Sequence, residues 1–373
     1  MANAGEPIRE MGLGRPPNED VQYCSRCCMP ETSEGTIFDD MGICRACQSS
    51  EQKMHIDWAE RQKGLGRVLE HYKSISGNNY DCLVPISGGK DSAFQLHLLT
   101  KVYGMKPLAC TFSHSWFTET GKYNLWNILE KVEADHIMFT PNRTLVNRIA
   151  RNSLQVIGDS CWHCHAGVGA FPLQVAVKFQ IPLVVWGESV AEAGNKASYD
   201  DQVTFDENYY REISMKADAD KMITDDISRR DLYPFQFPTK EELETVGVRG
   251  IFLGDYIFWD GERQVEFLKE EYGWREDDVE GTYKGYKSVE CRMSGVHDYA
   301  KYVKRGFGRT TDHASQDVRA GLLTREEAFE LIRELDGKRP DELDYYLEIT
   351  GYTEEEFENI LKAKRTGKAK DLV

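Results

Sequence analysis

Residues 82–94, with the sequence CLVPISGGKDSAF, decide the fold of this chain. An apolar run leads into two glycines, and a helical pattern follows with apolar residues at Ala93, Leu96, Leu99 and Val102. Glycine reaches backbone conformations closed to other residues, so successive amide groups can face one anion, and the start of the following helix adds partial positive charge. The stretch therefore predicts a strand, an anion-binding loop and a helix.

The side chains of this loop suit a nucleotide phosphate. Serine hydroxyls can donate hydrogen bonds, Lys90 supplies a point charge, and Asp91 can cap the helix or help to hold Mg²⁺. The spacing is not that of a Walker loop. We predict that a phosphate group is bound by Ser87, Gly88, Gly89, Lys90, Asp91 and Ser92, of which the last three are the predicted catalytic residues. The alternative is a serine-glycine turn before a capped helix.

Strand-like runs recur along the following part of the chain. They cover residues 80–86, 108–113, 136–140, 183–186 and 251–258, with helix-like stretches such as 93–103 and 123–132 between them. This alternation predicts an α/β fold with a doubly wound parallel sheet, whose ligands bind beyond the carboxyl ends of the strands. Gly187 and Glu188 follow one such strand and are predicted to contact nucleotide or Mg²⁺. Pro85 is unexpected in a central strand, because proline cannot donate to the ladder.

The 373 residues predict one large domain with appendages. We expect a disordered leader at 1–20, a zinc ribbon at 21–55, a catalytic domain at 56–260 with a helical insertion at about 199–245, and a mostly helical region at 261–373.

Charge and hydropathy favour a small-molecule substrate. The formal net charge is −16, which disfavours a broad nucleic-acid footprint built from Lys and Arg. No apolar run approaches the roughly 20 residues of a membrane span, and the start lacks the apolar core of a signal peptide. We therefore expect a cytoplasmic protein with no membrane span and no nucleic-acid partner.

Two Cys-x-x-Cys pairs near the amino terminus predict a metal site. Cys24, Cys27, Cys44 and Cys47 have the spacing with which two knuckles supply four thiolates to one tetrahedral Zn²⁺. Four protein ligands close such a site, so its role would be structural. Buried free cysteines are the alternative, but the segment is too short to bury them well.

A further pair, Cys161 and Cys164, lies within the sequence CWHCH. Two thiols and up to two imidazoles could complete a second metal site, hold an iron–sulfur cluster or form a redox pair. A core segment without metal is equally compatible with the pattern.

The loop sequence Ser-Gly-Gly-x-Asp-Ser resembles the PP-loop of ATP pyrophosphatases. Three separated blocks, at 23–58, 87–92 and 308–327, together resemble the N-acetyl sugar amidotransferase family of the WbpG/PseA-like type, over about residues 21 to 350. This resemblance implies an ATP-dependent, AMP-forming carbon–nitrogen ligase in lipopolysaccharide or flagellar-glycan biosynthesis. Its cofactors would be ATP, Mg²⁺ and Zn²⁺.

In the implied reaction, ATP adenylylates the acetamido oxygen of an N-acetyl sugar, which is either nucleotide-linked or a precursor. Ammonia then displaces AMP to give an acetamidino group. The resemblance also implies two partners that supply ammonia, a HisH-like glutaminase subunit and a HisF-like cyclase barrel subunit. The third block offers a polar set suited to a sugar or a nucleotide diphosphate, namely Arg309, Asp312, His313 and Arg319. A capped helix start with solvated charges is the alternative.

Two other functions fit parts of the sequence. A PP-loop sulfurtransferase that thiolates tRNA would also combine this loop with zinc ribbons and Cys-x-x-Cys pairs, and Cys161 and Cys164 support it. A zinc-ribbon binding module with a vestigial loop is less compatible with an intact Lys90 and Asp91. The chain shows no glutaminase nucleophile of its own, since Ala2 excludes an amino-terminal cysteine.

Overall fold

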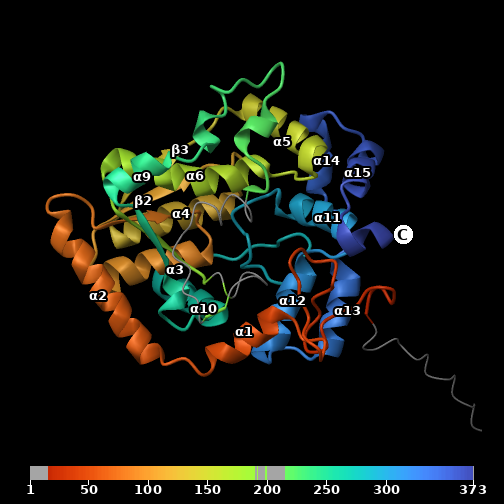
Figure 1. Cartoon of the computed structure of the whole chain (residues 1–373), viewed down its shortest axis with the longest axis horizontal. Helices are drawn as coiled ribbons and strands as arrows, with labels where there is room; N and C mark the ends of the chain where they lie inside the picture. The colour runs from red at the N-terminus through yellow and green to blue at the C-terminus, as the bar shows by residue number, and fades with distance from the viewer. Residues whose placement is uncertain (1–15, 190, 192–197, 200–214, 373) are drawn as a thin grey trace, which may run out of the picture.

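The computed structural model describes residues 16–189, 191, 198–199 and 215–372 (Figure 1). Most of the predicted leader and residues 200–214 of the predicted insertion lie outside the described residues. The described chain forms a parallel sheet with helices on both faces and a further group of helices at its carboxyl end. The predicted α/β fold with a doubly wound parallel sheet is therefore confirmed.

The sheet has the order β3-β2-β1-β4-β5, and all of its neighbouring strands are parallel. The strands are β1 (Cys82–Pro85), β2 (Pro107–Phe112), β3 (Asp135–Phe139), β4 (Leu183–Trp186) and β5 (Arg249–Phe252). The chain runs outward from β1 to β3 and then crosses back to β4 on the other side of β1. The strand order therefore reverses between β1 and β4, which is where doubly wound sheets bind ligands.

The α-helices follow the predicted alternation. Those before and between the strands are α1 (Arg45–Lys53), α2 (Trp58–Ser76), α3 (Lys90–His97), α4 (Glu119–Val132), α5 (Arg143–Ile157), α6 (Trp162–Phe179) and α9 (Lys240–Val246). Those after β5 are α10 (Gly261–Tyr272), α11 (Ser294–Arg305), α12 (Arg309–Ala320), α13 (Arg325–Leu335), α14 (Glu342–Thr350) and α15 (Glu354–Ala363). None of these helices in the described part of the chain is long and apolar enough to cross a membrane.

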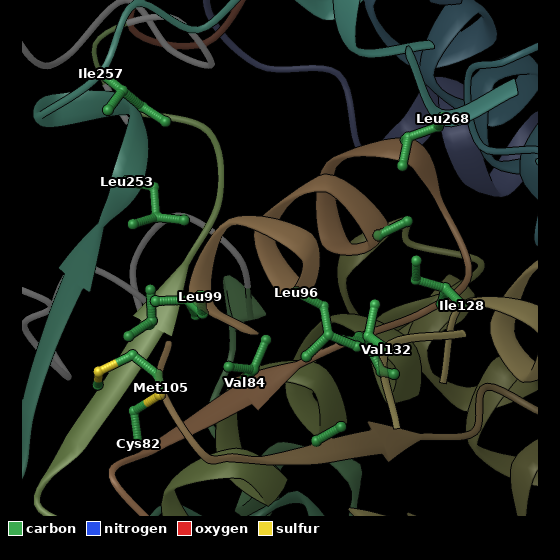
Figure 2. Close-up of a cluster of buried hydrophobic side chains, with 14 of the residues drawn as sticks. Cys82, Val84, Leu96, Leu99, Met105, Ile128, Val132, Leu253, Ile257 and Leu268 are labelled. Carbon is green, nitrogen blue, oxygen red and sulfur yellow. The ribbon is translucent and has the colours of Figure 1, made fainter. Parts of the chain in front are cut away.

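Alternate residues of β1 belong to two different cores. Cys82 and Val84 pack with Leu96 of α3, Ile128 of α4 and Leu268 of α10 on one face of the sheet (Figure 2). Leu83 packs on the opposite face, where α5 and α6 supply their apolar sides. A strand turns successive side chains to opposite faces, so continuous apolar sequence predicts burial on both. The sheet is the middle of three layers.

The buried amide of Gln95 explains how Pro85 fits a central strand. In the register that pairs Leu83 with Val184, a residue with an N–H at position 85 would donate to the carbonyl of Val185. The side-chain amide of Gln95 donates to that carbonyl instead. A side chain from α3 therefore donates the hydrogen bond that Pro85 cannot donate.

One strand is shorter than predicted. The run at 251–258 continues as strand only to Phe252, and Leu253–Asp255 form a 3₁₀ turn. Gly254 N–H donates to the Gly187 carbonyl at 2.9 Å, so the chain bends over the end of β4 instead of extending the sheet. Hydropathy alone could not separate these buried turn residues from strand.

The amino-terminal cysteine segment packs against the carboxyl-terminal helices (Figure 1). The Arg325 guanidinium at the start of α13 donates to the carbonyls of Cys24 and Cys27 at 3.0 Å each. Another carboxyl-terminal group, α11, α14 and α15, shares a core with α5. The two ends of the chain are thus joined to each other and to the α/β domain.

Two glycine-to-alanine variants are expected to change stability in opposite directions. At Gly167 in α6, an added Cβ would overlap the Phe112 ring, so Gly167→Ala should lower the free energy of unfolding by about 1–3 kcal/mol. At Gly66 in α2 nothing lies within 4 Å, so Gly66→Ala should raise it by about 0.5–1 kcal/mol through helix propensity. Thermal unfolding of both variants checks this, and equal effects would contradict the tight α6–sheet packing.

Candidate functional site

The glycine loop lies between β1 and α3, beside the point where the strand order reverses. Its residues bond among themselves, because Ser87 N–H donates to Ser92 Oγ at 3.2 Å and Ser92 Oγ donates to the Gly89 carbonyl at 3.0 Å. Gly89 is the N-cap of α3. The predicted strand, loop and helix are therefore all present.

Two glycines hold the loop against neighbouring segments. Gly88 has φ +90°, and a Cβ there would lie 2.5 Å from the Gly121 carbonyl oxygen. A Cβ on Gly121 would in turn overlap the Cα of Glu290. Trp274 Nε1 donates to the Gly88 carbonyl at 3.0 Å. There is thus no room for a side chain between the backbones of three segments: the loop, the first turn of α4 and residues 288–291.

An ion pair between buried Lys90 and the partly exposed Asp91 sits at the start of α3. Lys90 is 3% exposed and its ammonium pairs with Asp91, which also accepts a hydrogen bond from Trp259 Nε1 at 3.0 Å. Burial by itself would lower the pKa of Lys90, but Asp91 and Glu188 outweigh this and raise it. The pKa of Asp91 is lowered, since Lys90 and Lys287 overcome the effect of its burial. Both groups are therefore charged near neutral pH.

The sequence analysis missed two residues that face the loop from the carboxyl-terminal region. Ser87 Oγ donates to Glu290 Oε1 at 3.4 Å, while Glu290 Oε2 is buried with no hydrogen-bond partner among the described residues. Burial raises the pKa of this carboxyl group. Lys287 lies close enough to Lys90 that burial and this neighbour together lower its pKa. Neither residue belongs to a recognisable motif, and only the fold brings them to the loop.

A cavity of about 420 Å³ opens beside the loop. This volume lies within the range of small-molecule sites, roughly 300–1,000 Å³. The loop contributes Ser87 and Ser92, and the carboxyl-terminal region contributes Glu290 and Arg309. The remaining polar or sulfur-bearing lining comes from Cys110, His114, Cys161, Cys164, His165, Ser288, Cys291, Met293, Ser294 and His297.

Gly187 and Glu188 lie at the carboxyl end of β4, as predicted. A Cβ on Gly187 would lie 3.2 Å from Gln95 Oε1 and 3.3 Å from the Trp259 ring, so glycine permits this close packing. Glu188 acts electrostatically on both Lys90 and Lys287. A carboxylate beside two lysines at this edge of the sheet suits a phosphate-bound cation or a charge-balancing role.

The four predicted substrate residues lie on α12 but face different surroundings. Arg309 lines the cavity and pairs with the buried carboxylate of Asp298. Asp312 pairs with Lys301, and His313 Nδ1 lies 2.7 Å from Thr282 Oγ1. Arg319 lies near the other end of the helix, where its guanidinium is 3.8 Å from Cys27 Sγ. Only Arg309 among these four lines the cavity.

The four amino-terminal cysteines converge. Cys24 Sγ lies 3.8 Å from Cys47 Sγ, and Cys27 Sγ lies 3.7 Å from Cys44 Sγ. Four sulfurs bonded to one ion at about 2.3 Å in a tetrahedron would lie about 3.8 Å apart. All four thiols are buried. The predicted set therefore has the geometry for a single metal ion, and its donor chemistry fits Zn²⁺.

Cys161 and Cys164 both line the cavity, and Cys291 from the carboxyl-terminal region lines it too. Cys161 is the N-cap of α6, and Cys164 lies in the first turn. All three are free thiols, and burial raises the pKa of Cys164 and Cys291. They are therefore protonated thiols at neutral pH in the absence of a bound metal or oxidant.

Replacement of one cysteine ligand tests the metal site. Cys44→Ser is expected to abolish Zn²⁺ binding at this cluster and to destabilise the carboxyl-terminal helices, because Arg325 depends on the carbonyls of Cys24 and Cys27. Zinc content by mass spectrometry and thermal unfolding measure both effects. Cys28→Ser is the matched control, since Cys28 is buried nearby but lies outside the cluster. Equal zinc content in the two variants would contradict the assignment.

A family profile described as "LPS biosynthesis protein WbpG-like, C-terminal domain" matches residues 280–370. An uncharacterized protein of Methanocaldococcus jannaschii is 21% identical over 306 residues, which cover 82% of this chain and 91% of that protein.

Among solved structures, the chain is similar to the U34-tRNA thiolase NcsA from Methanococcus maripaludis with its 4Fe-4S cluster. The identity is 16%, and the match covers 89% of this chain and 96% of that chain. The TM-score is 0.34, which supports no conclusion about function. The profile match instead includes Glu290, Cys291 and Arg309, which line the cavity beside the loop. Residues 280–370 therefore match the carboxyl-terminal domain of WbpG-like lipopolysaccharide-biosynthesis proteins.

Proposed function

We propose that the protein is an ATP-dependent, AMP-forming amidotransferase that converts the acetamido group of an N-acetyl sugar into an acetamidino group. The observation that carries the proposal is a shared cavity. The ATP loop forms one side of it, and the WbpG-like carboxyl-terminal domain forms another through Glu290 and Arg309. A nucleotide on the loop would therefore meet a substrate held by the family-specific domain.

An amide carbon resists ammonia because its oxygen is a poor leaving group. In the proposed reaction the acetamido oxygen attacks the α-phosphorus of ATP, the bond to pyrophosphate breaks, and an O-adenylyl imidate forms. Ammonia then adds to the imidate carbon, AMP leaves with the oxygen, and proton loss gives the amidine. Oxygen is replaced by NH, and no enzyme nucleophile is required.

The residues of the loop suit the first step. Lys90 and Lys287 provide positive charge beside the loop amides, where negative charge grows on the departing pyrophosphate. Mg²⁺, held through the phosphates with Asp91 or Glu188 as protein ligands, would add to this stabilisation. Burial of Lys90 and its pairing with Asp91 would hold the lysine in place without reorganisation.

Ammonia is proposed to come from partner proteins. No group in the described chain combines a cysteine nucleophile with the setting of a glutaminase, and the cavity cysteines have protonated thiols. A HisH-like glutaminase and a HisF-like barrel would deliver ammonia to the cavity. Ammonium salts should replace them in vitro.

Incubation of the protein with ATP, Mg²⁺, ammonium chloride and UDP-linked N-acetyl sugars tests the reaction. We expect AMP, pyrophosphate and a sugar whose mass shows NH in place of O. Lys90→Met should lower AMP formation by about 10²–10³-fold, because the charge offered to the leaving group is lost. The control is Lys240→Ala, which removes an exposed lysine on α9 and should leave the rate unchanged. ADP formation would refute adenylylation.

Glu290 is expected to make ATP binding depend on pH. Burial raises its pKa, so the protonated, neutral form persists above the ordinary range of glutamate. As the pH rises through this pKa, a carboxylate forms 3.4 Å from Ser87 Oγ in the loop and repels the phosphates. Affinity for ATP should therefore fall with rising pH, and Glu290→Gln should flatten this dependence in calorimetric titrations. An identical pH profile in the variant would refute this role.

The cavity cysteines favour one other candidate function. Cys161, Cys164 and Cys291 line the same cavity as the loop, as a sulfurtransferase acting on tRNA would require. AMP release without a change in sugar mass, together with tRNA binding that weakens steeply with salt, would support that function over the amidotransferase.

A further inference from the structure

Three side chains outside the ATP loop converge at the cavity wall. Asp159, His165 and His297 each offer one ligating atom, and these atoms all lie within 4.8 Å of one another. Asp159 follows α5, His165 lies in the first turns of α6, and His297 lies on α11 in the carboxyl-terminal domain. We propose that these three residues bind a divalent transition-metal ion. The proposal does not depend on the reaction proposed above.

The spacing of the donor atoms supports a shared ion. Asp159 Oδ2 and His165 Nδ1 are 3.1 Å apart. Two ligands bonded at about 2.0–2.2 Å to a tetrahedral or octahedral ion lie about 3.0–3.5 Å apart. Asp159 is 6% exposed, so this carboxylate is withdrawn from water before any ion binds.

Outer partners orient the ligands, as in established metal sites. Asp159 Oδ1 accepts a hydrogen bond from the Cys161 N–H at 2.7 Å, which fixes the carboxylate plane. His297 Nδ1 lies 3.4 Å from Asp298 Oδ1, which leaves Nε2 as its ligating atom. Asp298 is itself buried and paired with Arg309. A carboxylate behind a ligating imidazole is a common feature of metal sites.

The site would remain open toward the cavity. Two imidazoles and one carboxylate fill three positions, and His165 and His297 both line the cavity. Such a set leaves at least one position for water or for an oxygen or nitrogen atom of a substrate. Nitrogen and oxygen ligands favour Zn²⁺, Co²⁺ or Fe²⁺ here over the softer ions that thiolates select. The competing explanation is a purely structural Asp159–His165 ion pair between helices.

Metal stoichiometry on the full chain separates these explanations. The protein is saturated with Zn²⁺, freed of unbound ion, and analysed for zinc per chain. We expect one equivalent beyond the ion held by the four amino-terminal cysteines. His297→Ala and the milder His297→Gln should each lose that equivalent and keep the cysteine-bound one, whereas Cys44→Ser should do the reverse. His71→Ala, which removes an exposed histidine on α2, should keep both.

Co²⁺ gives a second readout that identifies the ligands. In Cys44→Ser, Co²⁺ should produce weak visible bands without the intense near-ultraviolet charge transfer of thiolate ligands. Asp298→Asn should weaken Co²⁺ binding about 10-fold or more, because the carboxylate behind His297 is lost. Thermal unfolding of this variant reports separately the effect of the lost pairing with Arg309.

Two results would overturn the proposal. The wild-type chain could hold no zinc beyond the equivalent that Cys44→Ser removes, which would leave the triad as a structural ion pair. Alternatively, the additional equivalent could be lost in Cys161→Ser, retained in both His297 variants, and accompanied by thiolate charge transfer. The cavity thiols would then be the ligands.

Discussion

Three backbone segments approach one another closely at Gly88, Gly121 and Glu290, and this contact holds the carboxyl-terminal region against the glycine loop. Gly88 touches the first turn of α4, and Gly121 leaves no room for a side chain against Glu290. These contacts fix the carboxyl-terminal segment directly over the glycine loop, because packed backbones have no flexible side chain through which to yield. The carboxyl-terminal region therefore cannot move away from this loop without opening these contacts. One steric constraint thus brings two sequence regions, about 200 residues apart, into one site.

The same backbone contact brings several ionisable side chains together around the loop. Lys90 and Lys287 lie beside Asp91 and Glu188, and Glu290 has a buried carboxyl oxygen with no hydrogen-bond partner in the described part of the chain. Isolated buried charges are costly, so each stays ionised only where an opposite charge compensates it, and Glu290 instead has a raised pKa. Phosphate groups on the loop would add negative charge beside both lysines. Asp91 and Glu188 balance the two lysines, and a protonated Glu290 adds no negative charge that would oppose an anion on the loop.

The sequence predicted those features that depend on local pattern. The loop glycines, the strand alternation and the two Cys-x-x-Cys pairs each act within a short window, and the sheet and the four-cysteine cluster agree with them. What escaped prediction depends on tertiary contact. Glu290 and His297 lie in unremarkable helical or loop sequence, and Gln95 in α3 became important only because Pro85 left a carbonyl unpaired. The end of β5 was missed for the same reason, since Gly254 turns there to meet Gly187.

The position of α12 shows why the amino-terminal cysteines belong to the architecture of the cavity. Arg309 begins the helix and lines the cavity, whereas Arg319 in the last turn lies 3.8 Å from Cys27 Sγ. Ten residues of helix span about 15 Å, so one rigid element joins the two places. A metal bound by four thiolates carries net negative charge, which Arg319 is placed to offset. A metal at the four cysteines would therefore anchor one end of α12, while the other end carries the arginine that lines the cavity.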